Sequence, residues 1–327
     1  MSNIIVHNLR AAADFLGTGA IETPIYDREI VDIVRRKSVF LDRIKSERGT
    51  GHPTRYFEQL AVATATDTDP RNLTPTVSGP NRVERSAPIK AFIAQENISL
   101  FDHDVTAQQG TYSGLEEKDI GDMVSAITRT QAKQAWSGTD TSLLVSSTTQ
   151  YVGLLTQIGL QSTIAPGASI IDGLKAEVAA MVADPDFDVE PTAIYLSPLL
   201  GNYIDQEAKA AKIELKEAVV AGVKVNAIAT QAGDLPLVSE QFIPTDTAGK
   251  YGFGNPPAGN KNYYAVILSE GMVERRYISG EQDNPNPRVF QLGLVSDLAR
   301  KFVCVKFDTI YAVGPGYAHA TVCVQRP

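Results

Sequence analysis

The hydrophobic pattern near the start of the chain predicts one helix. Residues 24–44 place Ile30, Ile33, Val34 and, less regularly, Phe40 on one side, with charged residues around them. Apolar residues at this spacing form the buried stripe of an amphipathic helix. About twenty weakly patterned residues precede it, so we expect an N-terminal arm before any compact domain.

Three more stretches have helical spacing. The first follows a capping box formed by Ser113 and Glu116, and the third begins with Ser197 as N-cap and Pro198 at the first helical position. The predicted helices cover 115–136, 169–183 and 198 to about 217.

Alternating apolar and polar residues predict strands on both sides of a polar segment. The signal is moderate over 56–62 and clearer over 82–93. Between them, residues 64–82 (TATDTDPRNLTPTVSGPNR) contain only three apolar residues, five threonines and three prolines. Proline and threonine favour an extended, stiff backbone. We therefore predict a long projecting hairpin whose tip, at about 3.3 Å per residue, can extend roughly 60 Å and is covered by something outside its own domain.

The second half of the chain mixes both patterns. A strand leads directly into the helix at 198, and 223–238 supplies further strand and turn. From 262 onward the chain is strand-like, with a turn rich in proline and asparagine and no helix of consequence. No fixed-period repeat is present, which excludes solenoids and propellers.

Composition indicates a soluble globular protein with a sizeable core. The chain has 327 residues, 43% hydrophobic and 21% charged, and no apolar run approaches the roughly 18 residues that span a bilayer. No signal peptide is recognisable, so we expect a protein made inside the cell. The net charge is −8, concentrated between 138 and 270. No cluster of Lys and Arg suited to phosphate binding occurs, so tight nucleic-acid binding is not expected.

No motif makes a case for an enzyme, a metal site or a cofactor. The four histidines are far apart, and FDHDV (101–105) is best explained as a polar turn. DPDFD (184–188) has the spacing of a calcium loop, but Val189 occupies the required glycine position. Cys304 and Cys323 lie in apolar stretches typical of buried free thiols.

The order of these elements resembles the major capsid protein of tailed bacteriophages, the Hong Kong 97-like fold. Its sharpest local pieces are PIYDREIVDIVRRKSVF (24–40), PTAIYLSPLLGNYI (191–204) and VERRYISGEQDNPNPRVFQL (273–292). The resemblance implies an α+β fold with N-arm, E-loop hairpin, P-domain with long spine helix, and α/β A-domain. The implied segments are 1–50 for the N-terminal arm, 51–93 for the E-loop, 94–137 for the P-domain with spine helix, 138–270 for the A-domain, and 271–327 for the return to P-domain strands and the C-terminal strand.

The resemblance also implies a structural function without catalytic residues. Many copies would assemble as hexamers and pentamers into an icosahedral shell around the double-stranded DNA of a tailed phage, without sequence-specific DNA binding. The implied location is the virion, after assembly in the host cytoplasm. The implied intersubunit residues are Arg71, Leu73, Val77, Arg82, Glu84 and Arg85 on the E-loop, and Ile30, Ile33, Val34 and Phe40 on the N-arm.

Two departures from the best-known member affect the expected partners. No Lys lies between Lys45 and Lys90, so a covalent cross-link from the E-loop is not expected. The chain begins directly with the arm, which favours a separate scaffolding protein. A portal and a cement protein are further expected partners. Two alternatives remain: an encapsulin-type nanocompartment shell, and a β-rich phage tail or cell-surface binding protein.

Overall fold

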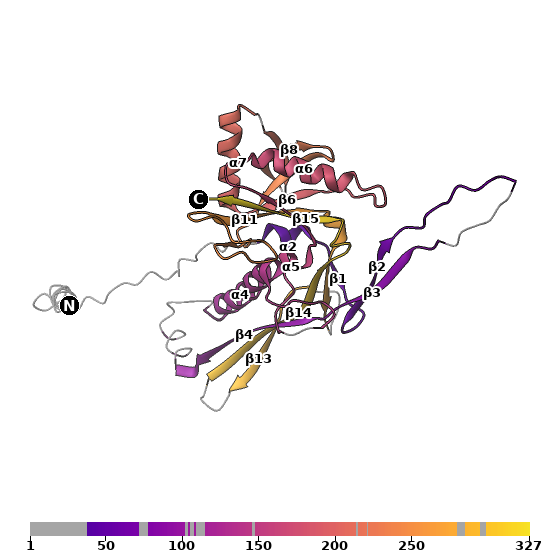
Figure 1. Cartoon of the computed structure of the whole chain (residues 1–327). Helices are drawn as coiled ribbons and strands as arrows, with labels where there is room; N and C mark the ends of the chain where they lie inside the picture. Colours follow the sequence, from indigo (N-terminus) through magenta and orange to yellow (C-terminus); the bar gives the residue numbers. More distant parts are fainter. Residues whose placement is uncertain are drawn as a thin grey trace, which may run out of the picture.

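The computed structural model describes residues 38–71, 78–101, 104, 108, 115–145, 148–213, 215–220, 222–279, 285–294 and 299–327. Figure 1 shows a body of two halves and a two-stranded hairpin that projects far beyond it. The helices are α2 (Val39–Arg43), α4 (Leu115–Ser137), α5 (Leu154–Gln157), α6 (Ile170–Val182) and α7 (Pro198–Ala211), with a 3-10 turn η1 (Glu270–Met272).

Each half of the body is organised around one sheet. The five-stranded sheet runs in the order β1, β12, β14, β13, and β4 also pairs with β14. The eight-stranded sheet runs β5, β15, β11, β6, β9, β8, β7, and β10 also pairs with β11. The strands of the first are β1 (Ser46–Arg48), β4 (Lys90–Ser99), β12 (Val273–Ile278), β13 (Arg288–Leu294) and β14 (Ala299–Ala312). Those of the second are β5 (Leu160–Ile164), β6 (Ala193–Leu196), β7 (Lys216–Val220), β8 (Val223–Thr230), β9 (Gly233–Ser239), β10 (Thr245–Asp246), β11 (Lys261–Leu268) and β15 (His319–Arg326).

The central strand β11 is buried on both faces. Side chains alternate along a strand, so Tyr263 and Ile267 belong to the core under α6 and α7, whereas Tyr264 and Leu268 belong to the core that also contains residues of α4. The two cores are therefore built on the two sides of one sheet.

The long helix α4 packs between the two halves (Figure 1). Its last turn carries Trp136, which is fully buried, with its ring 4.5 Å from that of Phe40. Gly138 follows, where an added Cβ would lie 2.3 Å from the carbonyl oxygen of Tyr151. Only glycine permits this close crossing of two backbone segments.

The predicted helices over 115–136 and 169–183 are confirmed, and the third is shorter than expected. Ser197 caps α7, its hydroxyl accepting the backbone N–H of Leu200 at 3.3 Å, and Pro198 is the first helical residue. The helix ends at Ala211, because Lys212 adopts a left-handed conformation with φ 54°. The prediction that it extends to Glu217 is wrong; that residue belongs to β7.

The predicted hairpin is confirmed, with one correction. β2 (Thr54–Ala61) and β3 (Asn81–Ala87) pair antiparallel, apart from both sheets. The expected single strand over 82–93 is broken after Ala87, because Pro88 has no N–H for a ladder. β4 starts at Lys90 and pairs with β14 in the five-stranded sheet.

The segment borders expected from the sequence do not coincide with the sheets. The border at residue 93 falls inside β4, and β15 of the last segment lies in the eight-stranded sheet beside β11. The described part of the predicted helix over 24–44 is α2; residues before 38 lie outside the described range.

Candidate functional site

The described residues offer little for catalysis or metal binding. They contain no group of three or more His, Cys, Asp or Glu side chains that could hold a metal ion, and none of their helices is long and apolar enough to cross a membrane. Cys304 and Cys323 are buried and unpaired with each other. Asp102, His103 and Val105 of FDHDV lie outside the described residues. In DPDFD the Asp184 carboxylate accepts the N–H of Asp186 in a local turn.

The projecting hairpin is the candidate site, and cross-strand ion pairs hold it together. Arg85 lies 2.8 Å from Glu58, whose side chain is buried, and Arg55 lies 3.1 Å from the exposed Glu84. Arg82 is exposed and makes no ion pair with a described residue. Of the predicted interface residues, Arg85 is thus engaged within its own hairpin, whereas Arg82 is open to a partner.

Beyond the paired strands the hairpin is almost entirely exposed. Residues 63–71 are exposed, including Arg71, and the two arms meet through Thr64, whose N–H and hydroxyl lie 3.1 and 2.8 Å from the Ser78 hydroxyl. Leu73 and Val77 lie outside the described residues. A polar, extended segment of this length gains no burial from its own chain.

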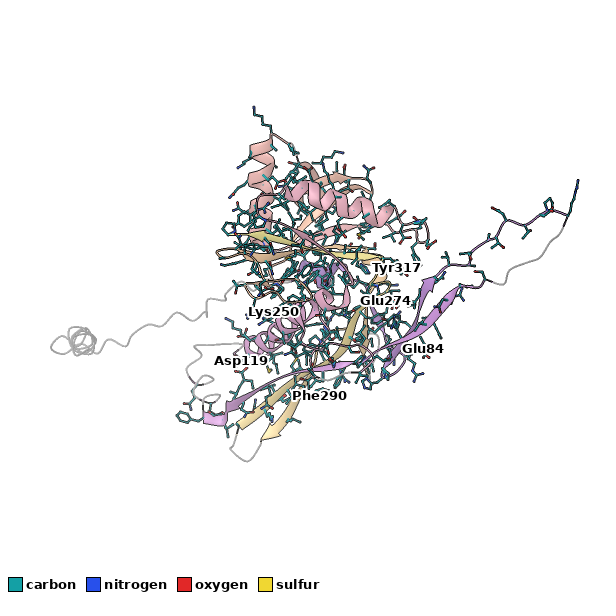
Figure 2. The ribbon with its side chains drawn as sticks, viewed as in Figure 1. Glu84, Asp119, Lys250, Glu274, Phe290 and Tyr317 are labelled. Carbon is teal, nitrogen blue, oxygen red and sulfur yellow. The ribbon has the colours of Figure 1, made fainter. Side chains whose placement is uncertain are left out.

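The base of the hairpin lies against both halves of the body. The ring of Tyr56 stacks on that of Tyr311 of β14, and Tyr317 donates a hydrogen bond to the backbone oxygen of Gln59 at 3.4 Å. Figure 2 labels Tyr317 on the body and Glu84 on the hairpin, close to the place where the hairpin leaves the body. Burial, followed by the charge of Glu58, raises the pKa of Tyr56 to about 12.

The first described residues of the chain, from Ser38 onward, are fastened inside the body. The buried carboxylate of Glu240 accepts the Ser38 hydroxyl at 2.9 Å and the N–H of Phe40 at 3.1 Å. Burial raises the pKa of Glu240, against these hydrogen bonds. Phe40 itself is fully buried between Trp136 and Tyr195.

The burial of Phe40 contradicts the prediction that this residue contributes to an intersubunit interface of the N-arm. Its ring is covered by its own chain, so it is a core residue and is not available on the surface of the subunit. Ile30, Ile33 and Val34 lie outside the described residues. The apolar side of an amphipathic helix is covered by another surface, but the pattern does not show whether that surface belongs to the same chain or to another chain. The sequence therefore could not distinguish a core residue from an interface residue.

A second exposed surface was not anticipated from the sequence. β4 and β13 flank one stretch of β14, and Ile93, Phe290 and Leu292 on them are 64%, 45% and 47% exposed. Figure 2 labels Phe290 on β13, in the half of the body opposite α6 and α7. Exposed apolar side chains gathered on one sheet are typical of interaction surfaces. The sequence signal that could have indicated this surface is the alternation of apolar and polar residues along β4 and β13.

A buried polar cluster ties α4 to the five-stranded sheet. Asp308 is fully buried and accepts hydrogen bonds from Gln131 and Tyr151, while Arg275 lies 3.3 Å away. Burial raises the pKa of Asp308 well above its usual range, against the hydrogen bond from Gln131. Burial, followed by the charge of Arg275, lowers the pKa of Lys306 to about 7. With its members hydrogen-bonded to one another, this cluster has a structural role.

Comparison with known proteins supports the fold through structure alone. No family model matches the chain, and no curated protein matches it. The capsid of an empty GTA particle is similar with a TM-score of 0.66 at 13% identity, over 94% of this chain and 97% of that one. The head structure of Helicobacter pylori bacteriophage KHP40 gives a TM-score of 0.64 at 10% identity, over 96% and 97%. The chain has the Hong Kong 97-like capsid fold.

An encapsulin is also similar. The holo-SrpI encapsulin complex from Synechococcus elongatus gives a TM-score of 0.59 at 13% identity, over 95% of this chain and 94% of that one. The α+β capsid fold expected from the sequence is thus confirmed, and phage capsids and an encapsulin both share it.

Proposed function

We propose that the chain is the major capsid protein of a tailed bacteriophage. Many copies would assemble as hexamers and pentamers into an icosahedral shell that encloses double-stranded DNA. The similarity to capsid structures over more than nine tenths of the chain supports this proposal most directly. The exposed hairpin supports it independently, because residues 63–71 are exposed in the single chain and are available to be covered by a neighbouring copy.

The segment assignments belong to this proposal. We assign 51–93 as the E-loop, which would lie across a neighbouring subunit, 94–137 as the P-domain with α4 as spine helix, and 138–270 as the A-domain around the capsomer centre. On the E-loop, Arg82 is an exposed charged residue of the paired strands that makes no ion pair with a described residue. The exposed apolar side chains of β4 and β13 would be covered by other copies.

The proposed partners follow from the shell. A scaffolding protein and a portal would take part in assembly in the host cytoplasm, and a cement protein is compatible with the exposed sheet. DNA would be enclosed without sequence-specific contacts. We propose no catalytic activity.

Electron microscopy of the purified full-length protein tests the proposal. A capsid protein should give closed particles or capsomers, whereas a tail or cell-surface binding protein would run as a small oligomer in sizing chromatography. Particles isolated from the native source should contain double-stranded DNA. An enzyme cargo in those particles would favour the encapsulin-type function instead, which shares this fold.

A further inference from the structure

The two faces of the hairpin differ in what they contact. Tyr56 faces the body, with its ring centroid 4.3 Å from that of Tyr311 and the planes 13° apart. Phe57, the next residue, points to the opposite face and is 74% exposed. The hairpin thus has one face that lies on the body and one that is free.

A second contact holds the same strand from the other half of the body. Tyr317 donates a hydrogen bond to the backbone oxygen of Gln59, and its ring stacks on that of Phe187 with centroids 3.9 Å apart. Because Tyr317 precedes β15 of the eight-stranded sheet and Tyr311 lies near the end of β14 of the five-stranded sheet, β2 is held by both halves.

A third contact fixes the return strand. Lys90, the first residue of β4, is 7% exposed, and its Nζ lies 2.9 Å from Asp140 and 2.6 Å from the backbone oxygen of Thr148. Removing one partner of such a buried pair leaves an uncompensated charge. The chain is therefore anchored directly after it leaves the hairpin.

The ring on which Tyr56 stacks is itself fixed. The Tyr311 hydroxyl donates to Glu274 at 2.6 Å, and Glu274 is paired with Arg276 at 2.7 Å. Arg276 also lies 2.5 Å from Glu47 of β1. Figure 2 labels Glu274 on the body beside the base of the hairpin. A ring held in this way gives the stack one orientation.

We propose that the Tyr56–Tyr311 stack, the Tyr317–Gln59 hydrogen bond and the Lys90–Asp140 pair form a lock that fixes the direction in which the hairpin leaves the body. The lock acts within a single subunit, before any neighbour is contacted. It deepens the proposed function, on which its purpose rests: a segment already held in its bound direction loses less conformational entropy when a partner covers it.

Distances between spin labels in the unassembled full-length chain test the lock. Asn81→Cys, at the far end of the paired strands, and Lys209→Cys on α7 provide exposed labelling sites, and the native Cys304 and Cys323 are buried. The locked hairpin should give one narrow distance distribution. Tyr56→Ala should widen that distribution about twofold or more, because the stack is lost while both cores are left intact.

Phe57→Ala is the matched control. It truncates a neighbouring aromatic ring on the same strand but on the free face, so the distribution should stay narrow. Lys90→Met should widen it as Tyr56→Ala does; if this variant fails to fold, the comparison of Tyr56→Ala with Phe57→Ala decides alone. An unchanged width in Tyr56→Ala, or equal widening in Phe57→Ala, would overturn the lock. Neither result bears on whether the protein forms shells, which microscopy tests separately.

Discussion

Arg43 and Glu270 form a bidentate ion pair that joins the end of α2 to the 3-10 turn η1. Arg43 Nε lies 2.6 Å from Oε1 of Glu270, and Arg43 Nη2 lies 2.7 Å from Oε2. The Tyr195 hydroxyl donates a hydrogen bond to the same carboxylate. The hydrogen bond to Glu270 raises the pKa of Arg43, against the effect of burial. Both side chains are largely covered, so the pair holds a fixed geometry.

Replacing Glu270 with Gln should lower the free energy of unfolding by about 2 kcal/mol. The substitution removes the charge but keeps the shape, so it leaves the guanidinium of Arg43 without its charged partner. This loss is measured by denaturant unfolding, monitored through the fluorescence of Trp136. Trp136 is the only tryptophan in the sequence, and it lies in the same core as Tyr195. As a control, Lys216→Gln breaks an exposed pair with Asp234 and should cost less than about 0.5 kcal/mol. Equal losses in both variants would contradict the prediction.

His319 should make the protein less stable in mild acid. It is fully buried on β15, and burial lowers its pKa from 6.5 to about 4, against a smaller opposing effect of the backbone of Val313 and Met272. Because the unfolded chain binds this proton more readily, the contribution of His319 to the free energy of unfolding should fall by up to about 3 kcal/mol between pH 6.5 and 4. Below pH 4 this contribution should stay constant.

The variant His319→Gln isolates that contribution, because glutamine does not titrate. The wild-type free energy of unfolding minus that of His319→Gln should fall by up to about 3 kcal/mol as the pH falls from 6.5 to 4, and should be constant at higher pH. His52→Gln, at an exposed position, should retain the pH dependence of the wild type. A wild-type to His319→Gln difference that is independent of pH would count against the buried neutral imidazole.

Charge reversal at Arg82 and at Arg85 should have different consequences. Arg82→Glu alters an exposed side chain and should reduce the yield of sedimenting particles without changing the melting temperature of the subunit. Arg85→Glu places a second carboxylate against the buried Glu58, so it should lower both. Normal particle yield for both variants would remove these residues from the interface.

The tip of the hairpin should be protected only in assembled material. Residues 63–71 are exposed in the single chain, so trypsin should cut after Arg71 readily in the unassembled subunit. In particles the same bond should resist, because a neighbouring copy would cover it. Mass spectrometry of the fragments identifies the bond, and equal cleavage rates in both preparations would show that the tip remains uncovered after assembly.

Local signals in the sequence were sufficient for several elements. Ser197 and Pro198 mark the start of α7 because a cap and its first helical residue are neighbours in sequence. The hairpin was predictable for a related reason, since two alternating strands on either side of a polar segment pair without reference to the rest of the chain.

Contacts between distant residues could not be predicted. The end of α7 depends on Lys212 adopting a left-handed conformation, which lysine rarely does. Phe40 looked like an interface residue because the covering ring, Trp136, is ninety-six positions away in the sequence. The cluster around Asp308 brings Gln131 and Tyr151 to one carboxylate across more than 150 residues, and no spacing rule connects them.

Because one face of β11 belongs to the same core as residues of α4 and β14, the two halves of the body share a continuous hydrophobic core instead of a linker. A force that pulls one half away from the other would have to expose this core to water before any relative movement began. In a closed shell, each subunit would therefore behave as one rigid body under tension, and the shell would deform mainly at the interfaces between copies.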